Sequence, residues 1–161
     1  MTKTQNKYIY PVKLEDIIRI SGTESPVHKV EFMNGIFRYA IDFFVPKGTL
    51  VLAAADGRVT EIKDDSEIGG NDLKYWDEGN LINIEHEFGE FSTYEHLKFR
   101  GVLVRPGERV RKGQQIGLNG YTGYTAGLEP HLHFMVFRYV TKDKFESLEI
   151  EWEDSFLADK R

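Results

Sequence analysis

The chain has 161 residues, enough to bury one sizeable hydrophobic core without covalent cross-links. It contains no cysteine, which excludes a disulfide framework and leaves His, Asp and Glu to hold any metal ion. The formal net charge of -5 argues against a nucleic-acid-binding surface, which is normally basic.

No apolar run approaches the roughly 20 residues that cross a bilayer, so we expect no membrane span. Residues 1–10 are polar and contain no apolar stretch of the kind found in a secretory signal. Two locations therefore stay open. The chain as written is expected in the cytoplasm, and it is expected outside the cytoplasmic membrane if a signal has been removed.

The N-terminal segment, residues 1–27, has the weakest pattern. Leu14, Ile17 and Ile18 stand at helical spacing, which allows a short helix near residues 14–20 that ends at Ser21-Gly22. The alternative is a segment that only packs on the core.

From Val30 onward, short stretches rich in Val, Ile, Phe and Tyr alternate with turn residues. Residues 64–79 do not follow this pattern: they are acidic and contain the aromatic pair Tyr75-Trp76. We interpret them as a long hairpin insertion, which forms either the wall of a binding site or a solvated loop. Alternation around Leu148, Ile150 and Trp152 predicts a last strand. The other predicted strands cover residues 37–45, 50–54, 58–63, 81–86, 91–97, 115–118 and 131–140.

This pattern predicts an all-β fold, an antiparallel sandwich or open barrel of the barrel-sandwich hybrid type. We expect a single domain over residues 1–161. Within it, residues 28–140 form the core, and residues 141–161 form a C-terminal strand and tail. The sequence contains no signal for an oligomeric state.

Two histidines stand two residues apart in the last long predicted strand. In a strand, His131 and His133 point to one face and Leu132 to the other. The two imidazoles could bind one metal ion, or one could bind while the other transfers protons. Two surface histidines at this spacing also occur by chance.

Two further polar groups lie in apolar strands. Alternation places Tyr94 and His96 on one face of residues 91–97. Asp42 stands among apolar residues, and a buried carboxylate needs a partner, which a metal ion, a backbone turn or Arg38 could supply. His86, just before a Phe-Gly turn, is expected to be structural.

In their order and spacing, these residues resemble the M23 (LytM/lysostaphin-type) zinc metallopeptidase domain. The similarity covers about residues 36–140, and the combination is more specific than any single piece. The matching segments after Asp42 are PKGT (46–49), AAADGRV (53–59), GNLINIEH (79–86), YEHL (94–97), GQQIG (113–117), GYTG (120–123) and PHLHF (130–134).

The resemblance implies an M23 peptidase fold with a substrate groove and one catalytic zinc ion. The zinc would be held by a histidine, by Asp42 and by His133, with water in the fourth position. His131 and His96 correspond to the histidines that activate the water and stabilise the tetrahedral intermediate. Loops 64–79 and 118–130 would form the walls of the groove.

One position departs from the family pattern. The first histidine ligand normally stands four residues before the aspartate, where this chain has Arg38, and arginine cannot bind zinc. His28 replaces that ligand if a hairpin turn at Asn34-Gly35 folds a His28 strand back beside Asp42. The rival explanation is a decayed site in which Arg38 takes the metal position.

We predict His28, Asp42 and His133 as metal ligands, with Arg38 pairing with a carboxylate or with a substrate carbonyl. The function expected from the resemblance is zinc-dependent endopeptidase activity on a peptide, with peptidoglycan cross-links as the family's usual substrate. The alternative is a catalytically inactive M23-like module that binds peptidoglycan or regulates a partner hydrolase. A biotinyl or lipoyl carrier is a third hypothesis, prompted by similar glycine turns near Gly48 and Gly107, but the residues that flank a carrier lysine are missing.

Overall fold

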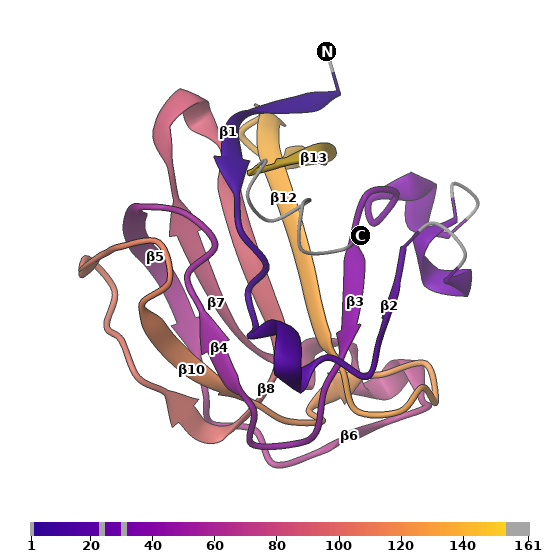
Figure 1. Cartoon of the computed structure of the whole chain (residues 1–161). Coiled ribbons are helices and arrows are strands. Elements are labelled where there is room, and N and C mark those ends of the chain that lie inside the picture. The colour runs from indigo at the N-terminus through magenta and orange to yellow at the C-terminus, as the bar shows by residue number, and fades with distance from the viewer. Residues whose placement is uncertain (1, 23–24, 30–31, 154–161) are drawn as a thin grey trace.

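The computed structural model describes residues 2–22, 25–29 and 32–153 (Figure 1). Most of the regular secondary structure in these residues is β-strand. None of their helices is long and apolar enough to cross a bilayer. The helices are short 3-10 segments: η1 (Leu14–Asp16), η2 (Pro26–His28), η3 (Met33–Gly35), η4 (Leu73–Glu78) and η5 (Glu87–Gly89).

One curled sheet contains most of the strands, as Figure 1 shows. Its longest path runs in the order β1 (Lys3–Tyr8), β13 (Lys144–Trp152), β12 (Leu132–Thr141), β8 (Phe91–Val102), β7 (Asn80–Glu85), β5 (Gly57–Lys63) and β9 (Arg109–Val110). The branches are β2 (Arg19–Ser21), β3 (Ile41–Phe44), β4 (Leu50–Leu52) and β10 (Gln115–Asn119). A separate parallel pair joins β6 (Gly69–Gly70) to β11 (Gly123–Tyr124).

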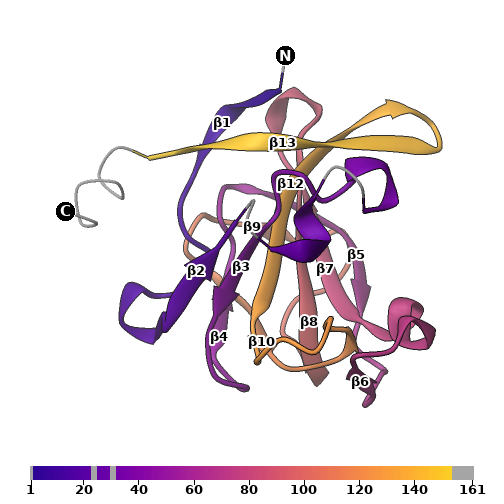
Figure 2. The ribbon, with the colours of Figure 1, turned by 90° about the vertical axis from the view of Figure 1, so that its right-hand side faces the viewer.

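The all-β fold expected from the sequence is confirmed, and pairing in the main sheet is antiparallel except for β1 with β13. Figure 2 shows β1 and β13 crossing the end of the sheet that lies away from β6. The hydrophobic core lies inside the curl. It includes Tyr8, Phe43, Tyr94, Phe134 and Ile150, so a single core joins the N-terminal strand to the last one.

The strand expected over residues 37–45 begins only at Ile41. Backbone hydrogen bonds from Arg38 to Gly35 and from Ala40 to Phe37 turn the chain before it. The helix expected near residues 14–20 is shorter than expected, a single turn followed by β2. Residues 64–79 do join two antiparallel strands, β5 and β7, as the hairpin interpretation expected.

One buried carboxylate fastens the N-terminal segment to the sheet. Glu90 is 2% exposed and accepts hydrogen bonds from the backbone N–H of Gln5 at 2.6 Å and from that of Asn6 at 3.2 Å. The same carboxylate accepts a bond from the Tyr8 hydroxyl at 3.0 Å. Burial, followed by the charge of Glu90, raises the pKa of Tyr8, so the phenol stays protonated as the donor.

We predict that Glu90→Ala lowers the free energy of unfolding by about 2–4 kcal/mol, because it leaves several buried donors without an acceptor. Chemical denaturation measures this loss. Glu87→Ala, at an exposed position three residues away, is the matched control and should change stability by less than about 0.5 kcal/mol. Equal effects of the two substitutions would contradict the role given to Glu90.

Candidate functional site

Three neighbouring strands place three polar side chains in one row. β12 lies between β3 and β8, and His133 pairs directly with Asp42 on one side and with Glu95 on the other. Directly paired residues point to the same face of a sheet. The flanking residues Tyr94 and Phe134 point into the core, so the row lies on the opposite face. Asp42 and His133 were predicted from the sequence as site residues, whereas Glu95 was not.

His28 reaches this row from outside the sheet. It ends η2 rather than lying in a strand, so the predicted hairpin was wrong, and Asn34 instead takes a left-handed conformation within η3. Nδ1 of His28 lies 2.8 Å from the Gly22 carbonyl oxygen, to which it donates a hydrogen bond. That bond leaves Nε2 as the lone-pair nitrogen, 3.4 Å from Asp42 Oδ1.

His28, Asp42 and His133 form a compact set of possible metal ligands. One ligand atom from each residue lies within 4.8 Å of the other two, and all three residues are buried. His28 Nε2 and Asp42 Oδ2 have no hydrogen-bond partner within the described residues. Buried polar atoms without partners are costly, and a cation bound between them would satisfy both.

The electrostatics of the row favour a charged carboxylate. Burial by itself raises the pKa of Asp42, but the hydrogen bond with His133 and the nearby imidazoles of His28 and His131 outweigh it and hold that pKa well below its usual range. Burial also lowers the pKa of His133, but the bond with Asp42 and the charge of Glu95 outweigh it, so the net shift is upward. Asp42 therefore stays ionised and can attract a cation, whereas burial raises the pKa of Glu95 at the other end of the row.

Arg38 is not part of this cluster. It is exposed, and its guanidinium carbon lies 5.3 Å from the centroid of the Tyr39 ring. The hypothesis that Arg38 takes the metal position is therefore wrong, and no ion pair joins it to a carboxylate in the described part of the chain. His86 also lies elsewhere, with Nδ1 2.7 Å from the Asp56 carbonyl oxygen, in agreement with a structural role.

Two more histidines stand beside the ligand set. His96 Nδ1 donates to the Thr122 carbonyl at 2.7 Å, and His131 Nδ1 donates to the Glu129 carbonyl at 2.8 Å. Each bond leaves Nε2 able to accept a proton. The ring centroids lie 4.7 Å apart. Burial, aided by neighbouring imidazoles, lowers the pKa of His96 to about 3, and burial also lowers that of His131, so both are neutral at pH 7.

A bulge in β8 turns His96 towards the site. Leu81 pairs with Glu95 and Asn80 pairs with Leu97, so β8 has one residue more than β7 at this point. That extra residue is His96, with φ of 70°. Such a bulge redirects a side chain. The prediction that His96 shares a face with Tyr94 is therefore wrong, because Tyr94 is in the core while His96 lines a cavity.

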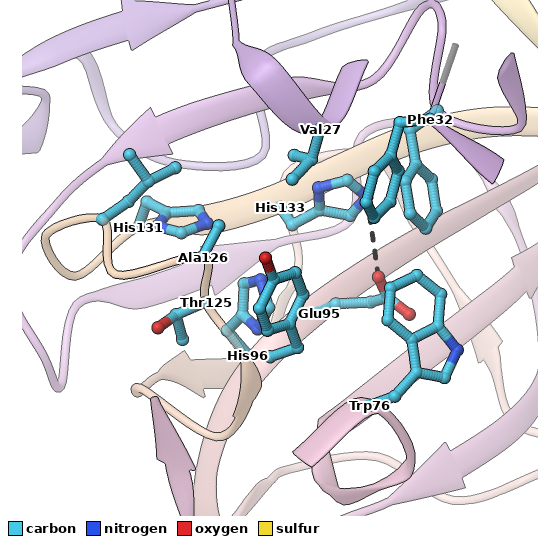
Figure 3. Close-up of a pocket in the computed structure, with 12 residues that line it drawn as sticks. Val27, Phe32, Trp76, Glu95, His96, Thr125, Ala126, His131 and His133 are labelled. Carbon is cyan, nitrogen blue, oxygen red and sulfur yellow. Dashed lines mark ion pairs between the residues drawn. The ribbon is translucent and has the colours of Figure 1, made fainter. Parts of the chain in front are cut away.

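This cavity, of about 110 Å³, opens beside the row and is shown in Figure 3. Both loops expected as groove walls contribute to it, through Trp76 from residues 64–79 and Tyr124 from residues 118–130. Phe32 and Phe37 complete an aromatic wall. Neither was predicted to line a site: Phe37 was expected to begin the strand over residues 37–45, and Phe32 lay outside every predicted element.

Known proteins are similar to this chain in sequence. The chain is 33% identical over 156 residues to the peptidoglycan DD-endopeptidase ShyC of Vibrio cholerae, a match that covers 91% of this chain and 33% of ShyC. It is 38% identical over 103 residues to the glycyl-glycine endopeptidase ALE-1 of Staphylococcus capitis, covering 63% of this chain and 25% of that protein. The chain thus spans a third or less of the length of these relatives.

Solved structures show the same fold. The catalytic domain of the antimicrobial peptidase lysostaphin from Staphylococcus simulans superposes with a TM-score of 0.57 and 27% identity, covering 80% of this chain and 87% of that domain. The model of peptidase family M23 matches residues 37–145, more than half of the chain. This chain belongs to peptidase family M23.

Proposed function

We propose that the chain is a zinc-dependent endopeptidase that cleaves peptide bonds in peptidoglycan. The observation that carries the proposal is the buried group of His28, Asp42 and His133 beside two neutral histidines. Three protein ligands of this type suit a catalytic zinc ion, which keeps one coordination position open.

Neighbouring groups contact the two histidine ligands on the nitrogen that faces away from the metal site. The Gly22 carbonyl accepts a hydrogen bond from His28, and Glu95 Oε2 lies 3.5 Å from Nε2 of His133, an ion-pair contact without hydrogen-bond geometry. Partners of this kind fix the tautomer and orientation of a metal-binding imidazole. A zinc ion held by these residues supplies Lewis acidity towards a peptide carbonyl and lowers the pKa of water towards about 7.

His96 and His131 handle protons in this proposal. Both present an unprotonated Nε2 next to the ligand set, because each Nδ1–H is engaged by a backbone carbonyl. A neutral imidazole in this position accepts a proton from the attacking water and later delivers one to the leaving amine. Their fixed orientation keeps both rings beside the scissile bond.

The substrate assignment depends on relatives. ALE-1 is named a glycyl-glycine endopeptidase and ShyC a peptidoglycan DD-endopeptidase, so peptide bonds of peptidoglycan are the substrate class we propose here. The cavity beside the row, with walls from two loops, could take one side chain or one end of such a peptide.

The metal assignment predicts about one zinc ion per wild-type chain and little zinc in His28→Ala or His133→Ala, because two ligands retain a zinc ion poorly. Elemental analysis of the purified proteins after incubation with zinc and removal of the excess measures this. Arg38→Ala is the matched control and should keep the wild-type zinc content, since Arg38 is exposed and lies outside the ligand set.

Unchanged zinc in His28→Ala would move the first ligand elsewhere. A wild-type chain that folds but retains no zinc would contradict the peptidase proposal. It would favour the inactive module that binds peptidoglycan or regulates a hydrolase.

The proton-transfer role predicts that His96→Ala keeps its zinc and loses at least about 100-fold in turnover, because acid–base catalysis contributes on that scale. Release of soluble fragments from purified peptidoglycan measures turnover, and elemental analysis measures zinc in the same samples. Full activity in His96→Ala would show that the assigned role is wrong. His86→Gln, at the structural histidine, serves as the control for loss of a buried imidazole elsewhere.

A further inference from the structure

The aromatic cavity beside the ligand row holds one acidic group. Of the described residues that line it, Glu95 is the one carboxylate, and the basic side chains are the histidines His96, His131 and His133. The Glu95 side chain is 31% exposed, so its carboxylate is accessible from the cavity. Within the described chain, its one ion-pair contact is His133 Nε2, 3.5 Å from Oε2. A cation entering the cavity can therefore approach this carboxylate.

Aromatic rings from three separate segments form the wall next to Glu95, as Figure 3 shows for Phe32 and Trp76. The Trp76 ring centroid lies 6.1 Å from that of Phe32, 5.8 Å from that of Phe37 and 6.1 Å from that of Tyr124. Trp76 itself is 37% exposed, which leaves part of its ring surface free for a ligand.

This combination discriminates between ligand classes. Aromatic faces attract organic cations, and tryptophan does so most strongly. The carboxylate adds a charge-assisted contact at the end of the apolar wall. A neutral aliphatic group would pack against the rings but would leave the half-buried Glu95 carboxylate poorly solvated. An anionic group would be repelled by the same carboxylate.

We propose that this cavity is a substrate subsite that binds a primary ammonium group on an aliphatic arm. The arm packs against Trp76 and Phe37, and the ammonium group contacts Glu95. The proposal rests on the peptidase function above, since a peptide brings the ammonium group to the row. A lysine-type side chain and a free peptide N-terminus share this chemistry.

The test titrates the full chain, with and without added zinc, with n-butylammonium at pH 7. Amide and indole NMR follow binding. The amine is protonated at this pH and has no lone pair for a metal ion. The chain has two tryptophans, so the Trp152 indole, partly buried against the core residues Tyr10 and Phe43, is an internal reference. We expect saturable shifts at Trp76 and none at Trp152. In the zinc-free chain, where butyrate has no metal ion to bind, 1-pentanol and butyrate should bind at least roughly tenfold more weakly than the amine.

Glu95→Gln keeps an oxygen that can accept from His133 but removes the charge. It should weaken n-butylammonium binding roughly tenfold while zinc content is retained. Phe37→Leu, which removes a ring face but keeps an apolar side chain, should weaken the same binding. Glu149→Gln, at an exposed position on β13, is the charge-matched control and should bind as the wild type does.

Two peptides separate the sources of the ammonium group. One is an N-acetylated tripeptide amide with a central lysine, and the other is a triglycine amide with a free N-terminus. Stronger binding of the first assigns a side-chain amine, and stronger binding of the second assigns a terminal amine. Either result supports the subsite.

Equal binding of the amine, the alcohol and the acid to the zinc-free chain would overturn the subsite. The subsite would also be overturned if Glu95→Gln bound the amine as tightly as the wild type does. If that variant also lost zinc, Glu95 would serve only to orient His133. These readouts require neither turnover nor metal, so an inactive chain that still bound the amine would refute the peptidase function and leave the subsite standing.

Discussion

The candidate site depends on the register of three antiparallel strands. Asp42, His133 and Glu95 meet because β12 pairs with β3 and β8 at the same residue. A slip of one residue would turn His133 into the core and Leu132 out of it. Leu132 and Phe134 are fully buried, and their burial stabilises the observed register by about 1.5–3 kcal/mol each. The hydrophobic core thus positions the polar row.

A bulge in β8 places His96 on the site side of the sheet, which a regular strand would not do. Regular alternation would place His96 on the core side of β8, and the bulge brings it to the side of Glu95. The left-handed φ of a non-glycine residue is unfavourable, and it persists because surrounding contacts hold it. The Thr122 carbonyl accepts from the imidazole, and the Gly120 N–H donates to the His96 carbonyl. The loop after β10 therefore fixes the histidine beside the row.

Much of this arrangement could be predicted from local pattern. Strand alternation places His131 and His133 on one side, and a carboxylate inside an apolar strand marks Asp42 as a residue that needs a partner. Alternation failed at His96, because a bulge is an exception to the period of two. It also gave no reason to select Glu95, which has meaning only through its pairing with His133 on another strand.

The sequence by itself determined the all-β class, most strand positions and the resemblance to M23 peptidases, because these depend on short-range periodicity and on motifs within single segments. Only the tertiary structure decided how the segments combine. His28 meets Asp42 through a 3-10 turn rather than a hairpin, and Arg38 stays exposed. Trp76 and Phe37 meet from distant loops to wall the cavity. Contacts of this kind are set by packing between segments, which local residue pattern does not encode.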